Sequence, residues 1–211
     1  MGSPIATLIL AHGAGAGQHS SFMVRIARAL AGERVAVATF DFPYMAARRK
    51  VPDRAPVLER AWREAIDAVR ADTAPPPLPL FIGGKSMGGR MASHVAAQGV
   101  AGVAGLVFLG YPLHPPGRPQ QRRDAHLPAI SEPMLFVQGE RDEFGTVEEI
   151  RELLPRLNDR TVVHAVTGGD HSFKVPARMG MSADAVLQDI VGAVVRFVGA
   201  TVSAGPSADP R

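Results

Sequence analysis

The chain has 211 residues, 46% of them hydrophobic, a formal net charge of +3 and no cysteine. This length supports one well-packed core and is short for two domains. The lack of cysteine excludes disulfides, a thiolate nucleophile and cysteine-ligated metal. Basic residues gather only in short runs, at 48–50 and 122–123, and not on an aromatic-rich stripe, which argues against nucleic-acid binding.

Targeting and membrane signals are weak in this sequence. Residues 5–10 are hydrophobic but too few for a signal peptide. No run reaches the ~18 apolar residues that a bilayer-spanning helix needs. We therefore expect a cytoplasmic monomer or homodimer that acts on a small molecule, with no membrane or nucleic-acid partner.

Apolar strands alternate with helical stretches along the whole chain. A strand at 5–11 ends in a glycine-rich turn at 12–17, and apolar residues then recur at helical spacing over 22–30. The following elements are expected in this order: strand 35–40, helix 58–69, strand 78–83, helix 87–97, strand 106–109, strand 134–138, helix 146–154, strand 161–166 and helix 187–197. The pattern predicts an α/β fold: a doubly wound, mostly parallel sheet of about six strands with helices on both faces.

Two long connections, 43–56 and 111–133, are rich in proline and arginine and are expected to form walls of a functional site. They carry six arginines, which suggest an anionic substrate: Arg48, Arg49, Arg54, Arg118, Arg122 and Arg123. We see no domain linker or internal repeat. Residues 1–199 are expected to form a single domain, followed by a disordered tail at 200–211.

The strongest motif is G-x-S-x-G at residues 84–88, placed directly after a strand and before a helix. In that context the turn is tight, its flanking residues must be tiny, and the serine hydroxyl points out over the sheet. Ser86 is therefore the candidate nucleophile. The neighbouring Lys85 is expected to point away from the substrate and to pair with a carboxylate such as Glu140.

A serine nucleophile needs a base, and the base needs an orienting acid. His171 follows the last strand after two glycines, and Asp142 follows the strand before it. Both lie at the strand ends that share an edge with Ser86. Glu140 is the rival acid, while Asp170, adjacent in sequence to His171, is expected to brace the loop.

Two backbone N–H groups should stabilise the oxyanion that develops during acyl transfer. Met87, directly after the nucleophile, is expected to supply one, and Ala14 in the glycine-rich turn the other, with Gly15 as the alternative. His12 is expected to pin this turn with its ring. Five further residues are expected to contact substrate: Gly13, Gly15, Tyr44, Tyr111 and His114.

These motifs resemble the α/β-hydrolase superfamily over about residues 5–199. Within it, the loops at 12–17, 84–90, 110–117 and 170–173 are similar to those of small lidless proteins near the dienelactone hydrolases. The resemblance implies a minimal fold of six strands and the same triad of Ser86, Asp142 and His171. Dienelactone hydrolases proper use a cysteine at the position of Ser86, so their substrate is not implied.

The sequence therefore predicts a serine hydrolase that cleaves an ester or thioester of a small acyl compound and needs no metal or cofactor. The alternative is a non-catalytic scaffold that keeps the hydrolase fold. That alternative comes from the resemblance, because the similar group includes a subunit of an animal histone-acetyltransferase complex. An intact triad argues for the enzyme.

Overall fold

A computed structural model describes residues 2–72 and 77–205. Its centre is a six-stranded, entirely parallel sheet in the order β2-β1-β3-β4-β5-β6. The strands are β1 (Ala6–Ala11), β2 (Val35–Phe40), β3 (Leu80–Lys85), β4 (Val103–Leu109), β5 (Met134–Gly139) and β6 (Val162–Val166). All six predicted strands are present, and the doubly wound α/β class is confirmed.

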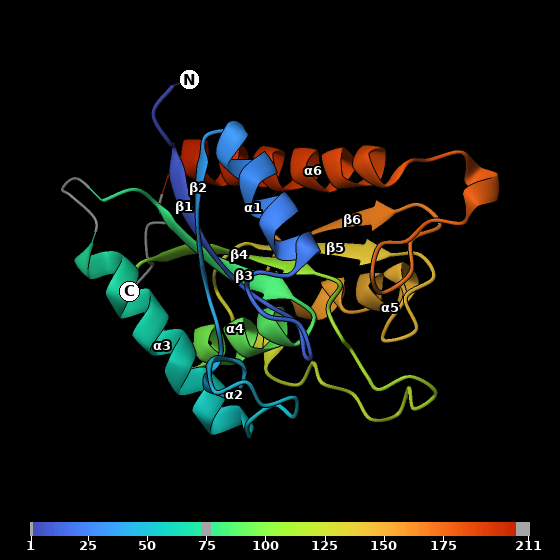
Figure 1. Cartoon of the computed structure of the whole chain (residues 1–211), viewed down its shortest axis with the longest axis horizontal. Helices are drawn as coiled ribbons and strands as arrows, with labels where there is room; N and C mark the ends of the chain where they lie inside the picture. Colours follow the sequence, from blue (N-terminus) through green and yellow to red (C-terminus); the bar gives the residue numbers. More distant parts are fainter. Residues whose placement is uncertain (1, 73–76, 206–211) are drawn as a thin grey trace.

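Helices cover both faces of the sheet (Figure 1). One face is covered by α1 (Ser21–Gly32) and α6 (Ala183–Ala204), and the other by α3 (Ala55–Ala71) and α4 (Met87–Ala97). Two short helices, α2 (Pro43–Ala46) and α5 (Val147–Arg151), lie in the connections that follow β2 and β5. The central strands β1, β3, β4 and β5 are therefore apolar on both sides, which explains their nearly continuous hydrophobic runs.

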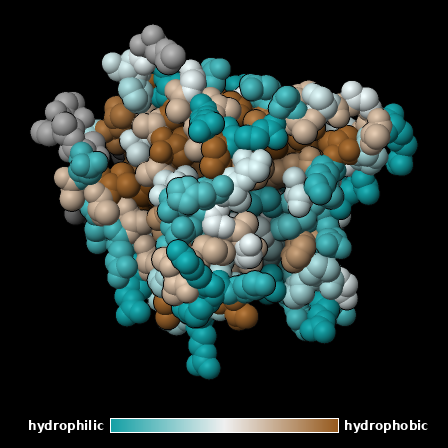
Figure 2. Space-filling view, viewed as in Figure 1, coloured by the Kyte–Doolittle hydropathy of each residue, from teal (hydrophilic) through white to brown (hydrophobic). Residues whose placement is uncertain are grey.

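Two hydrophobic clusters fill the space between these layers. Trp62 of α3 and Met91 of α4 are fully buried on one face, and Ile26 of α1 and Val194 of α6 are fully buried on the other. Figure 2 shows that hydrophilic residues project around the outline of the molecule, with hydrophobic residues mostly in the upper half of that view. The apolar periodicity of each helix thus faces the sheet.

The last helix is longer than the sequence predicts. It begins after its N-cap Ser182 and continues to Ala204, so residues 200–204 are helical and not part of a disordered tail. No proline interrupts residues 183–204, and Val202 packs against the core, which extends the helix as far as Gly205. Residues 206–211 lie outside the described part of the chain.

This same helix, with 22 residues, is long and apolar enough to cross a membrane by length and composition. Val186, Ile190, Val194 and Val198 are nevertheless buried on its inner face, against the sheet. Core packing therefore accounts for its apolar composition.

Strand β3 is predicted at 78–83 and lies at Leu80–Lys85, and other element bounds differ by a few residues. Two further differences lie in the connections. The expected loop at 43–56 contains α2, with proline in its first turn. The expected helix at 146–154 divides into α5 and a 3₁₀ turn at Leu154–Arg156, because Pro155 cannot continue an α-helix. Helix α5 begins with a capping box between Thr146 and Glu149.

Candidate active site

Ser86 occupies the turn between β3 and α4 with a backbone conformation that non-glycine residues rarely adopt. Its φ is 50° and its ψ is −117°. Such a conformation costs about 1–3 kcal/mol and persists only where the surrounding structure enforces it. A hydrogen bond of 3.1 Å from the Ser86 N–H to the Leu109 carbonyl ties the turn to β4.

The two glycines of the motif are required by close backbone contacts. A Cβ at Gly84 would lie 2.3 Å from the Ala11 carbonyl oxygen, and a Cβ at Gly88 would lie 2.4 Å from the same atom. Strand β1 therefore presses against both ends of the turn, since Ala11 pairs with Gly84 in the sheet. The G-x-S-x-G spacing follows from this contact, because only glycine fits at either position.

Three side chains from distant parts of the chain meet at the carboxyl edge of the sheet. The His171 Nε2 lies 2.8 Å from the Ser86 Oγ, and the His171 Nδ1 lies 2.8 Å from Oδ2 and 3.0 Å from Oδ1 of Asp142. An ionised carboxylate only accepts hydrogen bonds, so Nδ1 carries the proton and the Nε2 lone pair faces the hydroxyl. The arrangement can therefore transfer a proton from Ser86 to His171.

The other two carboxylates near this edge have different partners. The Glu140 Oε2 accepts a 2.8 Å hydrogen bond from the Gly168 N–H. The Asp170 Oδ1 accepts from the N–H groups of Ser172 (2.8 Å) and Lys174 (2.9 Å). Both shape the loop that carries His171, and Asp142 is the carboxylate that contacts its ring.

Asp142 is fixed by groups beneath it. It is 1% exposed, and it accepts hydrogen bonds from the Phe144 N–H at 2.8 Å and the Gln138 Nε2 at 2.9 Å. The Gln138 amide also accepts from the Tyr111 N–H at 2.8 Å and donates to the Gly145 carbonyl at 2.6 Å. Gln138 is not among the residues predicted from the sequence, although a glutamine at the end of an apolar strand is a visible signal.

Lys85 links the serine turn to the histidine loop. Its Nζ donates a 2.6 Å hydrogen bond to the His171 carbonyl and lies 5.1 Å from the centre of the Phe173 ring. The predicted pairing with Glu140 is wrong, because that carboxylate binds Gly168. Burial lowers the pKa of Lys85 to about 8, against the opposing charges of Asp142 and Asp170.

The glycine-rich turn after β1 faces Ser86. A Cβ at Gly13 would lie 3.6 Å from the Ser86 Cβ, and Ala14 lines a cavity together with Ser86 and Met87. The His12 ring pins this turn as expected: its Nδ1 lies 2.8 Å from the Gly13 carbonyl, and its Nε2 accepts from the Phe42 N–H at 3.2 Å. Burial lowers the pKa of His12, which favours the neutral ring that these bonds require.

The cavity has a volume of about 260 Å³. Leu58 of α3, Met91 of α4 and Phe144 give it apolar walls, and the Phe144 ring lies 4.2 Å from the His171 ring, centre to centre. Among the residues that the structure describes, no group of three or more His, Cys, Asp or Glu side chains is arranged to hold a metal ion. A cavity of this size suits a small organic molecule.

The five predicted substrate contacts do not line this cavity. Tyr44 and Tyr111 are 0% and 1% exposed, and the Tyr111 hydroxyl donates to the Arg123 carbonyl at 2.9 Å. His114 is buried and lies 3.0 Å from Glu149. The large rings of the two tyrosines are in the core, where burial of apolar area stabilises the fold. Gly13 is buried beside Ser86, and Gly15 lies on the exposed side of its turn.

Comparison with known proteins identifies the fold. The family described as "Alpha/beta hydrolase domain" matches residues 4–199. The chain belongs to the α/β-hydrolase family.

Solved structures give the same class. A lidless a/b serine hydrolase from Xanthomonas campestris is 22% identical, with 97% of this chain and 86% of that chain covered and a TM-score of 0.72. A dienelactone hydrolase from Anabaena variabilis is 18% identical (93% and 87% covered, TM-score 0.73). The esterase domain of a Rhodothermus marinus protein is 19% identical (93% and 89% covered, TM-score 0.65). At these identities, the likeness establishes the fold.

Proposed function

We propose that the protein is a serine hydrolase that cleaves an ester or thioester of a small acyl compound through an acyl-enzyme. The observation that carries this proposal is the continuous path from Asp142 through His171 to Ser86, with 2.8 Å at both junctions. The strained backbone of Ser86 adds support, because it is typical of a nucleophile turn and because Ser86 lines the same cavity as Ala14 and Met87.

In the proposed mechanism, the His171 Nε2 takes the Ser86 proton as the hydroxyl oxygen attacks the substrate carbonyl. The N–H groups of Met87 and Ala14 stabilise the oxyanion, and Asp142 stabilises the imidazolium. His171 then gives its proton to the leaving alcohol or thiol. Water, activated by the same imidazole, hydrolyses the acyl-enzyme and restores Ser86.

A labelling experiment tests this proposal. Purified protein is treated with a fluorophosphonate probe and assayed with p-nitrophenyl acetate and butyrate. Wild type should be labelled at Ser86, and Ser86→Ala should lose both labelling and on the order of 10⁶-fold in kcat, as when a comparable serine nucleophile is removed.

Ser93 provides a matched control. Its Oγ also lies 2.7 Å from a histidine nitrogen, that of His126, but the residue is fully buried. Ser93→Ala should therefore keep the label. Folded wild-type protein that takes up no probe and hydrolyses neither ester would overturn the proposal in favour of the scaffold alternative.

A further inference from the structure

Two arginines line the same cavity as Ser86. Arg90 lies one helical turn after Ser86 on α4, and its backbone N–H donates to the Ser86 carbonyl at 3.0 Å. Arg123 comes from the long connection between β4 and β5 and is half-buried. Two arginines from separate elements therefore line the cavity that holds the nucleophile.

Neither guanidinium has a direct carboxylate partner among the described residues, and only the more distant Glu59, which contacts His94, offsets part of the Arg90 charge. Among the described residues, no carboxylate forms an ion pair with Arg90 or Arg123, and the buried Nε of Arg90 has no hydrogen-bond partner. The acid in the cavity wall, Asp53, is already held by both terminal nitrogens of Arg49, at 2.7 and 3.0 Å. The wall around Arg90 therefore carries excess positive charge.

The two charges also act on each other. Burial and the nearby charge of Arg123 lower the pKa of Arg90. A partly buried cation with an unpaired donor is costly for the folded state unless an anion completes it. Guanidinium groups bind carboxylate and phosphate oxygens in a geometry that a single point charge does not offer.

We infer that Arg90 and Arg123 form a subsite for an anionic oxygen group, a carboxylate or a phosphate, carried by the substrate of Ser86. This inference rests on the proposed function, because both arginines share the cavity of the proposed nucleophile. Leu58 and Met91 line the same cavity and can pack against the methylenes of a short chain. The implied substrate is a small ester or thioester with a negative charge on its acyl part.

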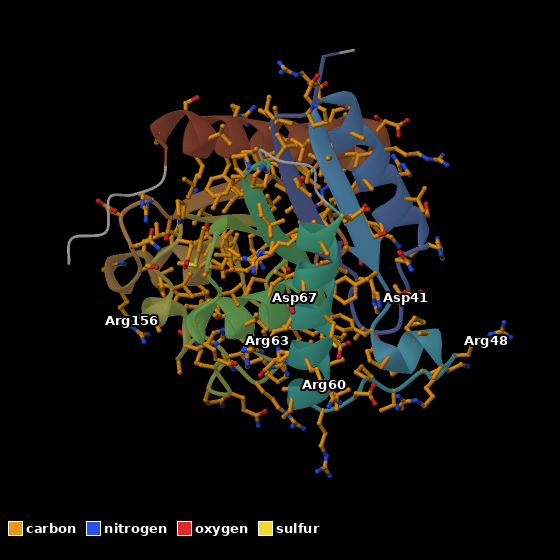
Figure 3. The ribbon with its side chains drawn as sticks, turned by 90° about the vertical axis from the view of Figure 1, so that its left-hand side faces the viewer. Asp41, Arg48, Arg60, Arg63, Asp67 and Arg156 are labelled. Atoms are coloured by element: carbon orange, nitrogen blue, oxygen red, sulfur yellow. The ribbon has the colours of Figure 1, made fainter. Side chains whose placement is uncertain are left out.

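The loop arginines highlighted by the sequence contribute less than expected. Of those six, Arg123 alone lines the cavity, and Arg90 was not among them. Figure 3 shows Arg48 projecting away from the body of the molecule. Arg122 pairs with Asp124 at 3.3 Å. The subsite thus depends on one helix residue and one loop residue, and not on the general basic character of the loops.

A pair of matched esters tests the subsite. The p-nitrophenyl monoester of glutarate carries a free carboxylate, and its methyl ester is the neutral counterpart. Wild type should prefer the charged ester in kcat/KM. Arg90→Gln and Arg123→Gln should each lose about ten- to a hundredfold on the charged ester and stay within about threefold on the neutral one.

Arg118→Gln is the matched control, because Arg118 belongs to the same loop as Arg123, is exposed and does not line the cavity. It should leave both rates unchanged. Arg90→Lys retains the charge without the guanidinium and should fall between wild type and Arg90→Gln. Circular dichroism melting checks that each variant is folded.

Binding to the Ser86→Ala variant separates this inference from the proposed function. Calorimetric titration with succinate, glutarate, adipate and inorganic phosphate requires no turnover. If Arg90→Gln in the Ser86→Ala background weakens binding, the subsite is supported even if no ester is hydrolysed. The ligand that binds more tightly shows whether the subsite prefers a carboxylate or a phosphate. Equal kcat/KM for the two esters, or no anion whose binding depends on Arg90 or Arg123, would overturn it.

Discussion

Asp142→Asn is the most informative single substitution, because the surroundings of Asp142 admit no well-paired amide. The Asp142 Oδ1 accepts from the Phe144 N–H at 2.8 Å, and Oδ2 accepts from the Gln138 Nε2 at 2.9 Å. An asparagine NH₂ in either position therefore faces a donor. Gln138 cannot rotate its amide to compensate, since its oxygen accepts from the Tyr111 N–H at 2.8 Å.

Two effects follow from this conflict. One buried hydrogen bond is lost, which should lower the free energy of unfolding by about 1–3 kcal/mol. Where the NH₂ group meets the His171 Nδ1, the ring must move its proton to Nε2, which then cannot accept from Ser86. A histidine held in the wrong tautomer reduces kcat by about 10⁴-fold, equivalent to about 5.5 kcal/mol of transition-state stabilisation.

The assay compares kcat on p-nitrophenyl butyrate with urea unfolding for the same variants. Glu140→Gln is the control, because Glu140 lies two residues away and a glutamine oxygen can still accept from the Gly168 N–H. It should change kcat by no more than about twofold. If Glu140→Gln abolished turnover while Asp142→Asn retained it within tenfold, the assignment of the orienting acid would be refuted.

Four further predictions concern stability. The pKa of Lys85 is 10.5 in the unfolded chain and about 8 in the folded chain. Between these two pH values, the free energy of unfolding of wild type should rise by up to about 1.4 kcal/mol per pH unit relative to that of Lys85→Met, as measured by urea unfolding. Gly88→Ala should cost about 3 kcal/mol. A Cβ added at Gly199 would have no atom within 4 Å apart from the backbone of its own helix. Gly199→Ala should therefore stabilise α6 by up to ~1 kcal/mol, as measured by thermal melts. Gln138→Leu strands buried backbone groups of Tyr111 and should cost at least about 2 kcal/mol and reduce kcat.

The rise in stability with pH follows from the lowered pKa of Lys85 in the folded chain. Between the two pKa values, the unfolded chain binds a proton that the folded chain does not, so stability rises with pH. Below pH about 8 both states are protonated, and the difference between wild type and Lys85→Met becomes constant.

Much of the fold is predictable from the sequence because buried parallel strands leave a direct signal. The run at 35–40 matches β2 at both ends, and the helix at 87–97 matches α4. Errors occur where tertiary contacts decide the outcome. Residues 200–204 continue α6 because Val202 packs against the core, a contact that local composition does not reveal.

The convergence of Ser86, Asp142 and His171 is also predictable, since the ends of parallel strands share one edge. The roles of the side chains around these three residues are less predictable. Tyr111 follows a strand end and resembles a pocket residue in sequence, but its ring packs against Phe108 and Phe136. Arg90 is predictable only once the helix phase relative to Ser86 is known, because residues four apart share a face.

The strand order places Ser86 and His171 after strands that differ in how easily they open locally. Ser86 leaves the central strand β3, whereas His171 follows β6, which has a neighbour on one side only and an exposed Val162. Local unfolding of a native protein begins at such sheet edges and requires less free energy than global unfolding. Mild heat or denaturant should therefore displace His171 first and abolish activity while the serine turn is still intact.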